Sequence, residues 1–144
     1  MLNELRAVVE ELGLGIIFGE SLRTTFDLQK AIRVGFPHST VEAVMGSARL
    51  TLKEIAASLD SSPRSLQRRR EGRLARYESD RLYRLARIVA LAKYYVGDEE
   101  TAIRWLKQPN RALGGIPPLQ AIDTEPGARS VENVLGRIAY GGVS

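Results

Sequence analysis

Apolar residues recur at the spacing of an α-helix along almost the whole chain, and glycine or proline interrupts them at short intervals. The first such segment precedes Gly13 and carries Leu2, Leu5, Val8, Val9 and Leu12, which is typical of an amphipathic helix ended by glycine. No segment alternates convincingly between apolar and polar residues, and no solenoid-length repeat is present. The pattern predicts an all-α protein of roughly seven to nine helices.

Several helix starts can be assigned from capping residues. A Ser or Thr followed three residues later by Glu predicts a capping box, in which each side chain accepts a backbone N–H of the other residue. Ser39 with Glu42 and Thr51 with Glu54 fit this pattern, and Ser62 precedes a proline that suits the first helical position. Helix starts are also predicted at Ser79, Asp98 and Thr124.

Positive charge is concentrated in one part of the chain. The formal net charge is +4, yet residues 64–93 alone carry ten basic and three acidic side chains, a net charge of +7. Nine of the ten basic residues are arginine, whose planar guanidinium suits both phosphate and guanine. This band predicts a nucleic-acid contact. The alternative is a solvated helix face.

Residues 51–73 have the pattern of a helix-turn-helix. A first helix over residues 51–59 has one apolar face, the turn 60–62 follows, and a second helix begins at Pro63 with Leu66 as its inward anchor. In this motif the second helix enters the major groove, and its first residues contact base edges. The predicted base contacts are Arg64, Ser65, Gln67 and Arg68, and the predicted phosphate contacts are Arg69, Arg70, Arg73 and Arg76. For each arginine alone, a solvated surface position is the alternative.

The only tryptophan lies beside the strongest helix breakers, in the stretch WLKQPNRALGGIPPLQAI, residues 105–122. Prolines limit the direction of the chain here, the Asn110 side chain can close a turn, and Gly114 and Gly115 tolerate positive φ. The stretch therefore predicts a rigid corner that returns the last helix. We expect Trp105 to lie in the core at this corner rather than on a partner.

The last segment, ARSVENVLGRIAYGGVS (residues 128–144), predicts an amphipathic helix followed by a tail of small residues. The residues alone favour a frayed terminus, and the alternative is a tail that inserts into a cleft on a partner. The apolar stripe of the helix consists of Val131, Val134, Leu135 and Ile138.

The residue inventory argues against an enzyme. The chain has no cysteine and one histidine, His38, so neither a thiolate nor a histidine-rich metal site is expected, and no cofactor is expected. Residues 13–19 read GLGIIFG but lack the preceding strand and the Lys-Ser/Thr pair of a phosphate-binding loop. No apolar run is long enough to span a membrane, and no signal-peptide pattern is present. With the absence of cysteine, these features favour the cytoplasm.

Two regions together resemble a known family. Residues 51–91 resemble the helix-turn-helix of Xre-type antitoxins, and residues from about 98 onward resemble the toxin-binding domain of the Xre/MbcA/ParS antitoxins. The second resemblance rests on the patterns WLxxPNxxLGGxxP and GAxxVxxxLxRIxYG. It implies an all-α fold in which an Xre-like helix-turn-helix core precedes a small helical toxin-binding domain.

The same resemblance implies an antitoxin whose partner is a RES-domain toxin that consumes NAD. Such antitoxins block the active site of the toxin and repress their own operon by binding operator DNA. They form dimers and higher heteromeric complexes with the toxin. With the resemblance, insertion of the tail is favoured over fraying. The expected toxin-binding residues are Arg129, Glu132, Asn133, Arg137, Tyr140, Gly141, Gly142, Val143 and Ser144.

The expected domain organisation follows from these assignments. Residues 1–47 form an N-terminal helical segment suited to dimerisation, residues 48–96 the helix-turn-helix region, and residues 97–144 the toxin-binding domain. Two alternatives stay open. One is a stand-alone transcriptional regulator whose C-terminal domain serves dimerisation or senses a ligand, and the other is a chromosome-segregation or scaffold protein.

Overall fold

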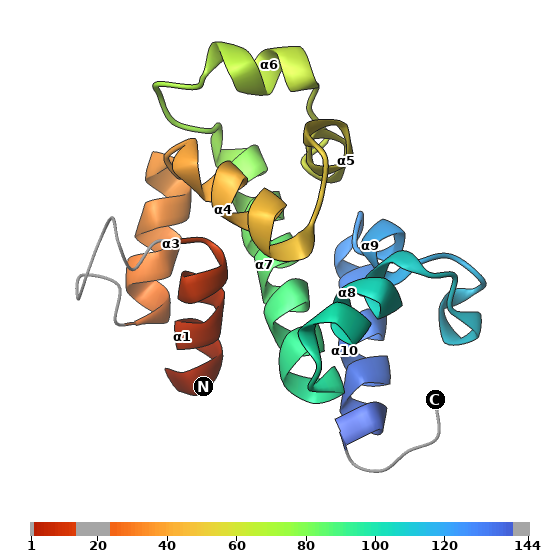
Figure 1. The fold of residues 1–144 in the computed structure, drawn as a ribbon. Helices are drawn as coiled ribbons and strands as arrows, with labels where there is room; N and C mark the ends of the chain where they lie inside the picture. Colours follow the sequence, from red (N-terminus) through yellow and green to blue (C-terminus); the bar gives the residue numbers. More distant parts are fainter. Residues whose placement is uncertain (1, 14–23, 140–144) are drawn as a thin grey trace. The chain divides into compact units, whose positions relative to one another are not determined.

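A computed structural model describes residues 2–13 and 24–139 (Figure 1). Within these ranges the chain is all-helical, which confirms the predicted fold class, and the only extended pairings are two isolated bridges. The chain divides into two compact units, residues 1–86 and 87–144. The division therefore falls inside one long helix, and the domain boundaries expected from the sequence stay a prediction. The two units are described separately.

The first unit contains the short helix that carries the predicted DNA contacts. Helix α4 contacts α1 and α5, and α5 contacts α6 (Figure 1). The helices are α1 (Leu2–Glu11), α3 (Thr25–Val34), α4 (Ser39–Ala48), α5 (Leu52–Ser58), α6 (Pro63–Arg68) and the first part of α7 (Arg76–Val96). The core includes Leu12, Phe36, Val41, Val44, Ile55, Leu59, Leu66, Leu82 and Leu85.

Local capping signals are confirmed at α5 and α6. The Thr51 hydroxyl accepts the Glu54 N–H at 3.1 Å, and the Glu54 carboxylate accepts the Thr51 N–H at 2.9 Å. At α6 the Ser62 hydroxyl accepts the Ser65 N–H at 3.1 Å, and Pro63 occupies the first turn. A second capping box, which was not predicted, starts α3. These caps satisfy N–H groups that a helix start otherwise leaves unpaired.

The predicted capping box at the start of α4 is wrong. The residue before the helix is His38, whose backbone is already helical (φ −57°, ψ −27°), and no side chain caps this end. Thr40 instead donates its hydroxyl to the carbonyl of Pro37 at 2.7 Å, and Glu42 lies 3.6 Å from the His38 ring. Because the chain enters α4 in helical conformation, Ser39 lies inside the first turn and cannot act as its cap.

The predicted start of α7 at Ser79 is also wrong, because α7 begins at Arg76. Ser79 is fully buried. Its hydroxyl accepts the backbone N–H of Phe36 at 2.9 Å and donates to the carbonyl of Ala75 at 3.0 Å. The hydroxyl therefore links two segments that lie far apart in the sequence, which a local capping pattern does not reveal.

The second unit is a small group of helices around the last one. Helix α9 contacts both α8 and α10, and η2 contacts α10. The elements after α7 are α8 (Glu99–Lys107), the 3₁₀ turn η2 (Arg111–Leu113), α9 (Pro118–Ala121) and α10 (Glu125–Ala139). The core includes Ile88, Val89, Ala92, Ala102, Leu106, Ala128, Val131, Val134 and Leu135.

Helix α8 starts at the predicted cap. The Asp98 carboxylate accepts the Thr101 hydroxyl at 2.6 Å and the Thr101 N–H at 2.9 Å. These two bonds, the one from the Thr101 hydroxyl most of all, hold the pKa of Asp98 below its ordinary value. The carboxylate therefore stays ionised at the N-terminus of α8, where negative charge is favoured.

The corner after α8 has the predicted turn chemistry. Asn110 accepts the N–H of Ala112 at 3.0 Å with its side-chain oxygen, and Gly114 and Gly115 have φ of 74° and 87°. Trp105 is only partly buried, so it belongs to the core in part. The shape of the corner is held by these backbone conformations and by the helix ends that flank it.

The close contact between α9 and α10 gives a stability prediction. A Cβ added to Gly127 would overlap the carbonyl oxygen of Ala121, whereas a Cβ added to Gly136, on the same helix, meets nothing within 4 Å. We expect Gly127→Ala to lower the free energy of unfolding by about 2 kcal/mol or more through overpacking. Gly136→Ala should raise it by about 0.5–1 kcal/mol, the helix propensity difference. Urea unfolding of both variants checks this, and equal effects would contradict the packing described here.

Candidate functional site

The two helices expected to form the DNA-binding motif pack as a helix-turn-helix. Ala56 and Leu59 at α5 and Leu66 of α6 are fully buried. In the turn between the helices, Asp60 adopts a left-handed conformation with φ 53°, which Asp tolerates better than most residues. The Ser61 N–H donates to the carbonyl of Ala56 at 2.9 Å. The buried side and the turn therefore fix the direction of α6.

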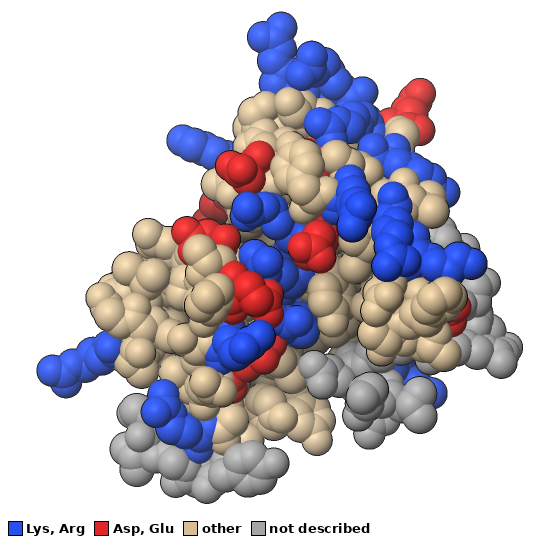
Figure 2. Space-filling model, turned by 180° about the vertical axis from the view of Figure 1, so that it is seen from behind, with Lys and Arg blue, Asp and Glu red and all other residues tan. Residues whose placement is uncertain are grey.

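Three of the four predicted base contacts lie on the solvent side of α6. Arg64, Gln67 and Arg68 are exposed, and Ser65 is partly buried. The Ser65 hydroxyl accepts a hydrogen bond from the Arg68 guanidinium at 3.3 Å. Lys and Arg side chains gather at the top of Figure 2, where Figure 1 places α6. Their contact with bases stays a prediction.

A buried carboxylate holds the loop that follows α6, residues 69–75, which we call the α6–α7 loop. Glu78 is fully buried and forms an ion pair with the guanidinium of Arg69. The same carboxylate oxygen accepts the N–H of Ala75 at 2.8 Å. A buried charge is tolerated when it is paired and hydrogen-bonded. Glu78 therefore ties the end of α6 to the start of α7.

The α6–α7 loop is also bound to the segment between α3 and α4, residues 35–38, which we call the α3–α4 linker. The Leu74 N–H donates to the carbonyl of Phe36 at 2.8 Å, and the His38 N–H donates to the carbonyl of Gly72 at 3.3 Å. A side chain at residue 35 would overlap the carbonyl oxygen of Leu74. Glycine there allows the two backbones to approach closely.

The structure separates the four predicted phosphate contacts into two kinds. Arg70 and Arg76 are exposed. Arg73 is exposed as well, and its guanidinium donates to the carbonyl of Gly35 at 2.9 Å. Arg69 is partly buried by its ion pair with a buried carboxylate. Arg69 is thus held by a buried partner, whereas the other three are exposed, and among them Arg73 also binds the backbone of Gly35.

Sequence reasoning missed Glu78 because it placed the start of α7 three residues too late. Glu78 is the third residue of α7 and accepts the N–H of Ala75, the residue before the helix. A Glu at this position is the acidic half of a capping box. If the helix start is placed at Arg76, the position of Glu78 three residues after Ala75 predicts that it caps the helix. The sequence gives no sign that Glu78 also pairs with Arg69.

The predicted toxin-contacting residues that the structure describes lie on α10. Arg129, Asn133 and Arg137 are exposed, whereas Glu132 is partly buried. Glu132 lies 2.8 Å from the guanidinium of Arg87 within the same unit. The opposite face of α10 is packed in the core, as predicted for Val131, Val134 and Leu135, and Ile138 is partly buried. The predicted residues outside the described part are Tyr140, Gly141, Gly142, Val143 and Ser144.

Residues 2–13 and 24–139 contain no group of three or more His, Cys, Asp or Glu side chains arranged to hold a metal ion. Over the same part of the chain, no helix is both long and apolar enough to cross a membrane.

Family models match both halves of the chain. Residues 27–87 match the antitoxin Xre-like helix-turn-helix domain. Residues 91–141 match the antitoxin Xre/MbcA/ParS C-terminal toxin-binding domain. The first match begins within α3, so it includes most of α3 and all of α4 as well as the α5–α6 motif.

Two curated relatives cover most of the chain, and a third covers less than half of it. A protein of Yersinia enterocolitica named antitoxin Xre is 32% identical over 142 residues, which are 96% of this chain and 92% of the relative. An antitoxin Xre of Photorhabdus laumondii is 32% identical over 121 residues, 81% of each protein. An antitoxin Xre of Pseudomonas putida is 42% identical over 64 residues, 44% of this chain and 40% of the relative.

The buried carboxylate generates a second prediction. Glu78→Gln keeps the shape of the side chain but removes the charge that pairs with Arg69. We expect it to lower the free energy of unfolding by about 1.5–3 kcal/mol, the value of hydrogen bonds to charged groups. Glu71→Gln, at an exposed position in the same loop, should change it by less than about 0.5 kcal/mol. Thermal unfolding of both variants tests the difference, and an unchanged Glu78→Gln protein would contradict the structural role of Glu78.

Proposed function

We propose that this chain, which belongs to the Xre/MbcA/ParS-type antitoxin family, neutralises a RES-type toxin with its C-terminal domain and represses its own operon by binding operator DNA with α6. Members of this family are antitoxins rather than enzymes. The observation that carries the DNA-binding half is the outer face of α6, where Arg64, Gln67 and Arg68 are exposed above a buried Leu66. Both activities would take place in the cytoplasm.

The exposed side chains of α6 suit a DNA site that contains both guanine and adenine. An arginine can donate two hydrogen bonds to guanine, and a glutamine can pair in the same two-point manner with adenine. Arg70, Arg73 and Arg76 follow in the α6–α7 loop and at the start of α7, and all three are exposed. Their charge suits phosphates on either side of the bases that α6 reads. Binding should weaken steeply as salt concentration rises, because each phosphate contact releases counterions.

The toxin-binding half rests on α10 and the tail beyond it. Buried residues hold one face of α10, so Arg129, Asn133 and Arg137 can contact a partner without disturbing the core. We propose that this face and residues 140–144 occlude the NAD site of the toxin. The identity of the toxin as a RES-type enzyme rests on the resemblance in sequence, since the matched domain is defined only as toxin-binding.

Operon repression implies a particular assembly. Helix-turn-helix proteins commonly bind as dimers to two half-sites one helical turn apart, roughly 34 Å. We propose that this chain dimerises and joins the toxin in a higher heteromeric complex. A two-fold symmetric operator upstream of the gene would be the corresponding feature in the DNA.

Removing one base contact should separate the two activities. Arg68→Ala and Gln67→Ala should each weaken operator binding roughly 5- to 150-fold, since a two-point base contact contributes about 1–3 kcal/mol. Fluorescence anisotropy with labelled operator DNA measures the loss. Both variants should still rescue growth of cells that express the toxin. If either change abolished rescue while the protein stayed folded, the separation of sites would be wrong.

Truncation at the other end should have the opposite effect. Deletion of residues 137–144 should weaken toxin capture more than about tenfold, as expected when central contacts of an interface are lost. Operator binding should stay within about twofold, and the anisotropy assay above measures it. Arg137→Ala tests the same face without shortening the chain, and Arg104→Ala, an exposed arginine on α8, is the control of equal charge. Capture by the truncated chain at full affinity would overturn the occlusion proposal.

A further inference from the structure

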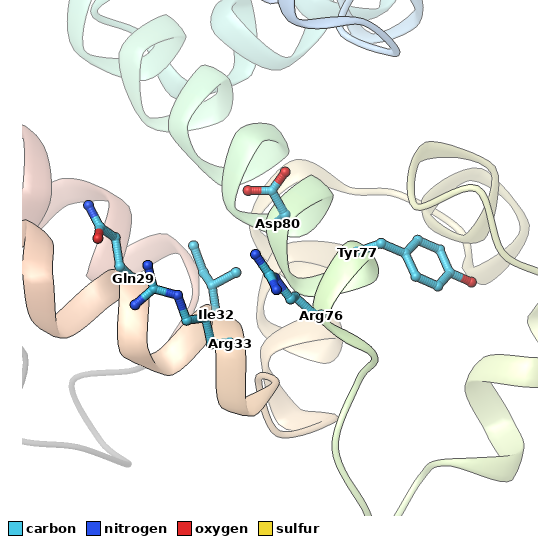
Figure 3. Close-up of a pocket in the computed structure, with 6 residues that line it drawn as sticks. All are labelled: Gln29, Ile32, Arg33, Arg76, Tyr77 and Asp80. Carbon is cyan, nitrogen blue, oxygen red and sulfur yellow. The ribbon is translucent and has the colours of Figure 1, made fainter.

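The first unit contains an open hollow, and the functions above use only Arg76 among the residues that line it. It lies between α3 and the start of α7 and has a volume of about 610 Å³ (Figure 3). Gln29, Ile32 and Arg33 line it from α3, and Arg76, Tyr77 and Asp80 line it from α7.

The hollow carries a net positive charge. In Figure 3 Arg33 and Arg76 line the hollow from different helices, with Ile32 between them, and Tyr77 points away from both. Asp80 is the single acidic residue in the lining. Arg33 and Arg76 are both exposed, and neither forms an ion pair with another residue in the described part of the chain. Two arginines and one carboxylate leave one positive charge, which matches one phosphodiester.

The hollow is connected to the DNA-reading helix through the α6–α7 loop. The guanidinium of Arg73 donates to the carbonyl of Gly35, two residues after Arg33, at 2.9 Å. The backbone of Leu74 donates to Phe36 at 2.8 Å. These bonds hold the loop that leaves α6 against the end of α3. Arginine side chains therefore continue from α6 through the loop to the hollow, where Arg33 is the member outside the helix-turn-helix.

We propose that this hollow binds a backbone phosphate of the operator, next to the bases that α6 reads, so that α3 is part of the DNA interface. The proposal rests on the proposed DNA-binding function. Arginine is suited to this contact because its planar donors form paired hydrogen bonds with phosphate oxygens. A phosphate contact fixes orientation and carries no base information. Arg33 therefore adds affinity for every DNA sequence alike.

The test uses Arg33→Gln in the full-length protein, with Arg6→Gln as the control. Arg6 is an exposed arginine on α1 of the same unit, and Figure 1 places α1 at the far end of this unit from α6. Affinity is measured by anisotropy for the operator and for an unrelated duplex at several salt concentrations. Arg33→Gln should weaken both complexes by a similar factor, roughly three- to tenfold. It should also reduce the slope of log affinity against log salt by about one.

Asp80→Asn should change DNA affinity in the opposite direction to Arg33→Gln. It removes the negative charge of the hollow, so it should strengthen binding to both duplexes by roughly two- to fivefold at low salt. Circular dichroism and thermal unfolding confirm that each variant is folded.

Three results would overturn the inference. Arg33→Gln could bind like Arg6→Gln, it could lose discrimination between the two duplexes, or it could weaken toxin capture instead, which would assign the hollow to the protein partner. Failure of the proposed function is distinct, because then the wild-type protein itself would not prefer the operator and Arg68→Ala would have no effect.

Discussion

The buried carboxylate of Glu78 is the interaction on which the proposed DNA-binding surface depends. It pairs with Arg69 at the end of α6 and with the backbone of Ala75 just before α7. The hydroxyl of Ser79, one residue later, joins the same region to Phe36 in the α3–α4 linker. A six-residue helix cannot hold its own position in water. These polar bonds, with Leu66 in the core, therefore give α6 a fixed direction.

Each of the two units has a helix with one buried apolar face and one exposed polar face, which suits the binding of two different partners. The first unit presents exposed arginines on α6 and in the loop after it. On α6 only the inner face, which carries Leu66, is buried in the core. The second unit packs one face of α10 and leaves Arg129, Asn133 and Arg137 on the other. Since the two surfaces belong to separate compact units, a contact made by one need not disturb the other.

Hydrogen bonds between residues close in the sequence could be predicted, whereas those between distant residues could not. The caps at Thr51 and Ser62 and the turn at Asn110 were predicted because each partner lies within three residues. The roles predicted for Ser39 and Ser79 are wrong. The chain enters α4 already in helical conformation, so Ser39 is not its cap. The hydroxyl of Ser79 accepts the backbone N–H of Phe36, 43 residues away, which no local pattern indicates. The tie between Arg69 and Glu78 and the position of Arg33 beside the start of α7 depend on tertiary packing, so no sequence pattern marks them.

Hydrogen–deuterium exchange of the full-length protein, free and bound in turn to operator DNA and to the toxin, tests the division of the two activities most directly. We expect DNA to slow backbone exchange in residues 63–76 and to leave residues 125–144 unchanged. The toxin should slow exchange in residues 125–144 and leave residues 63–76 unchanged. Protection of α6 by the toxin, or of α10 by DNA, would contradict the separation of the two surfaces.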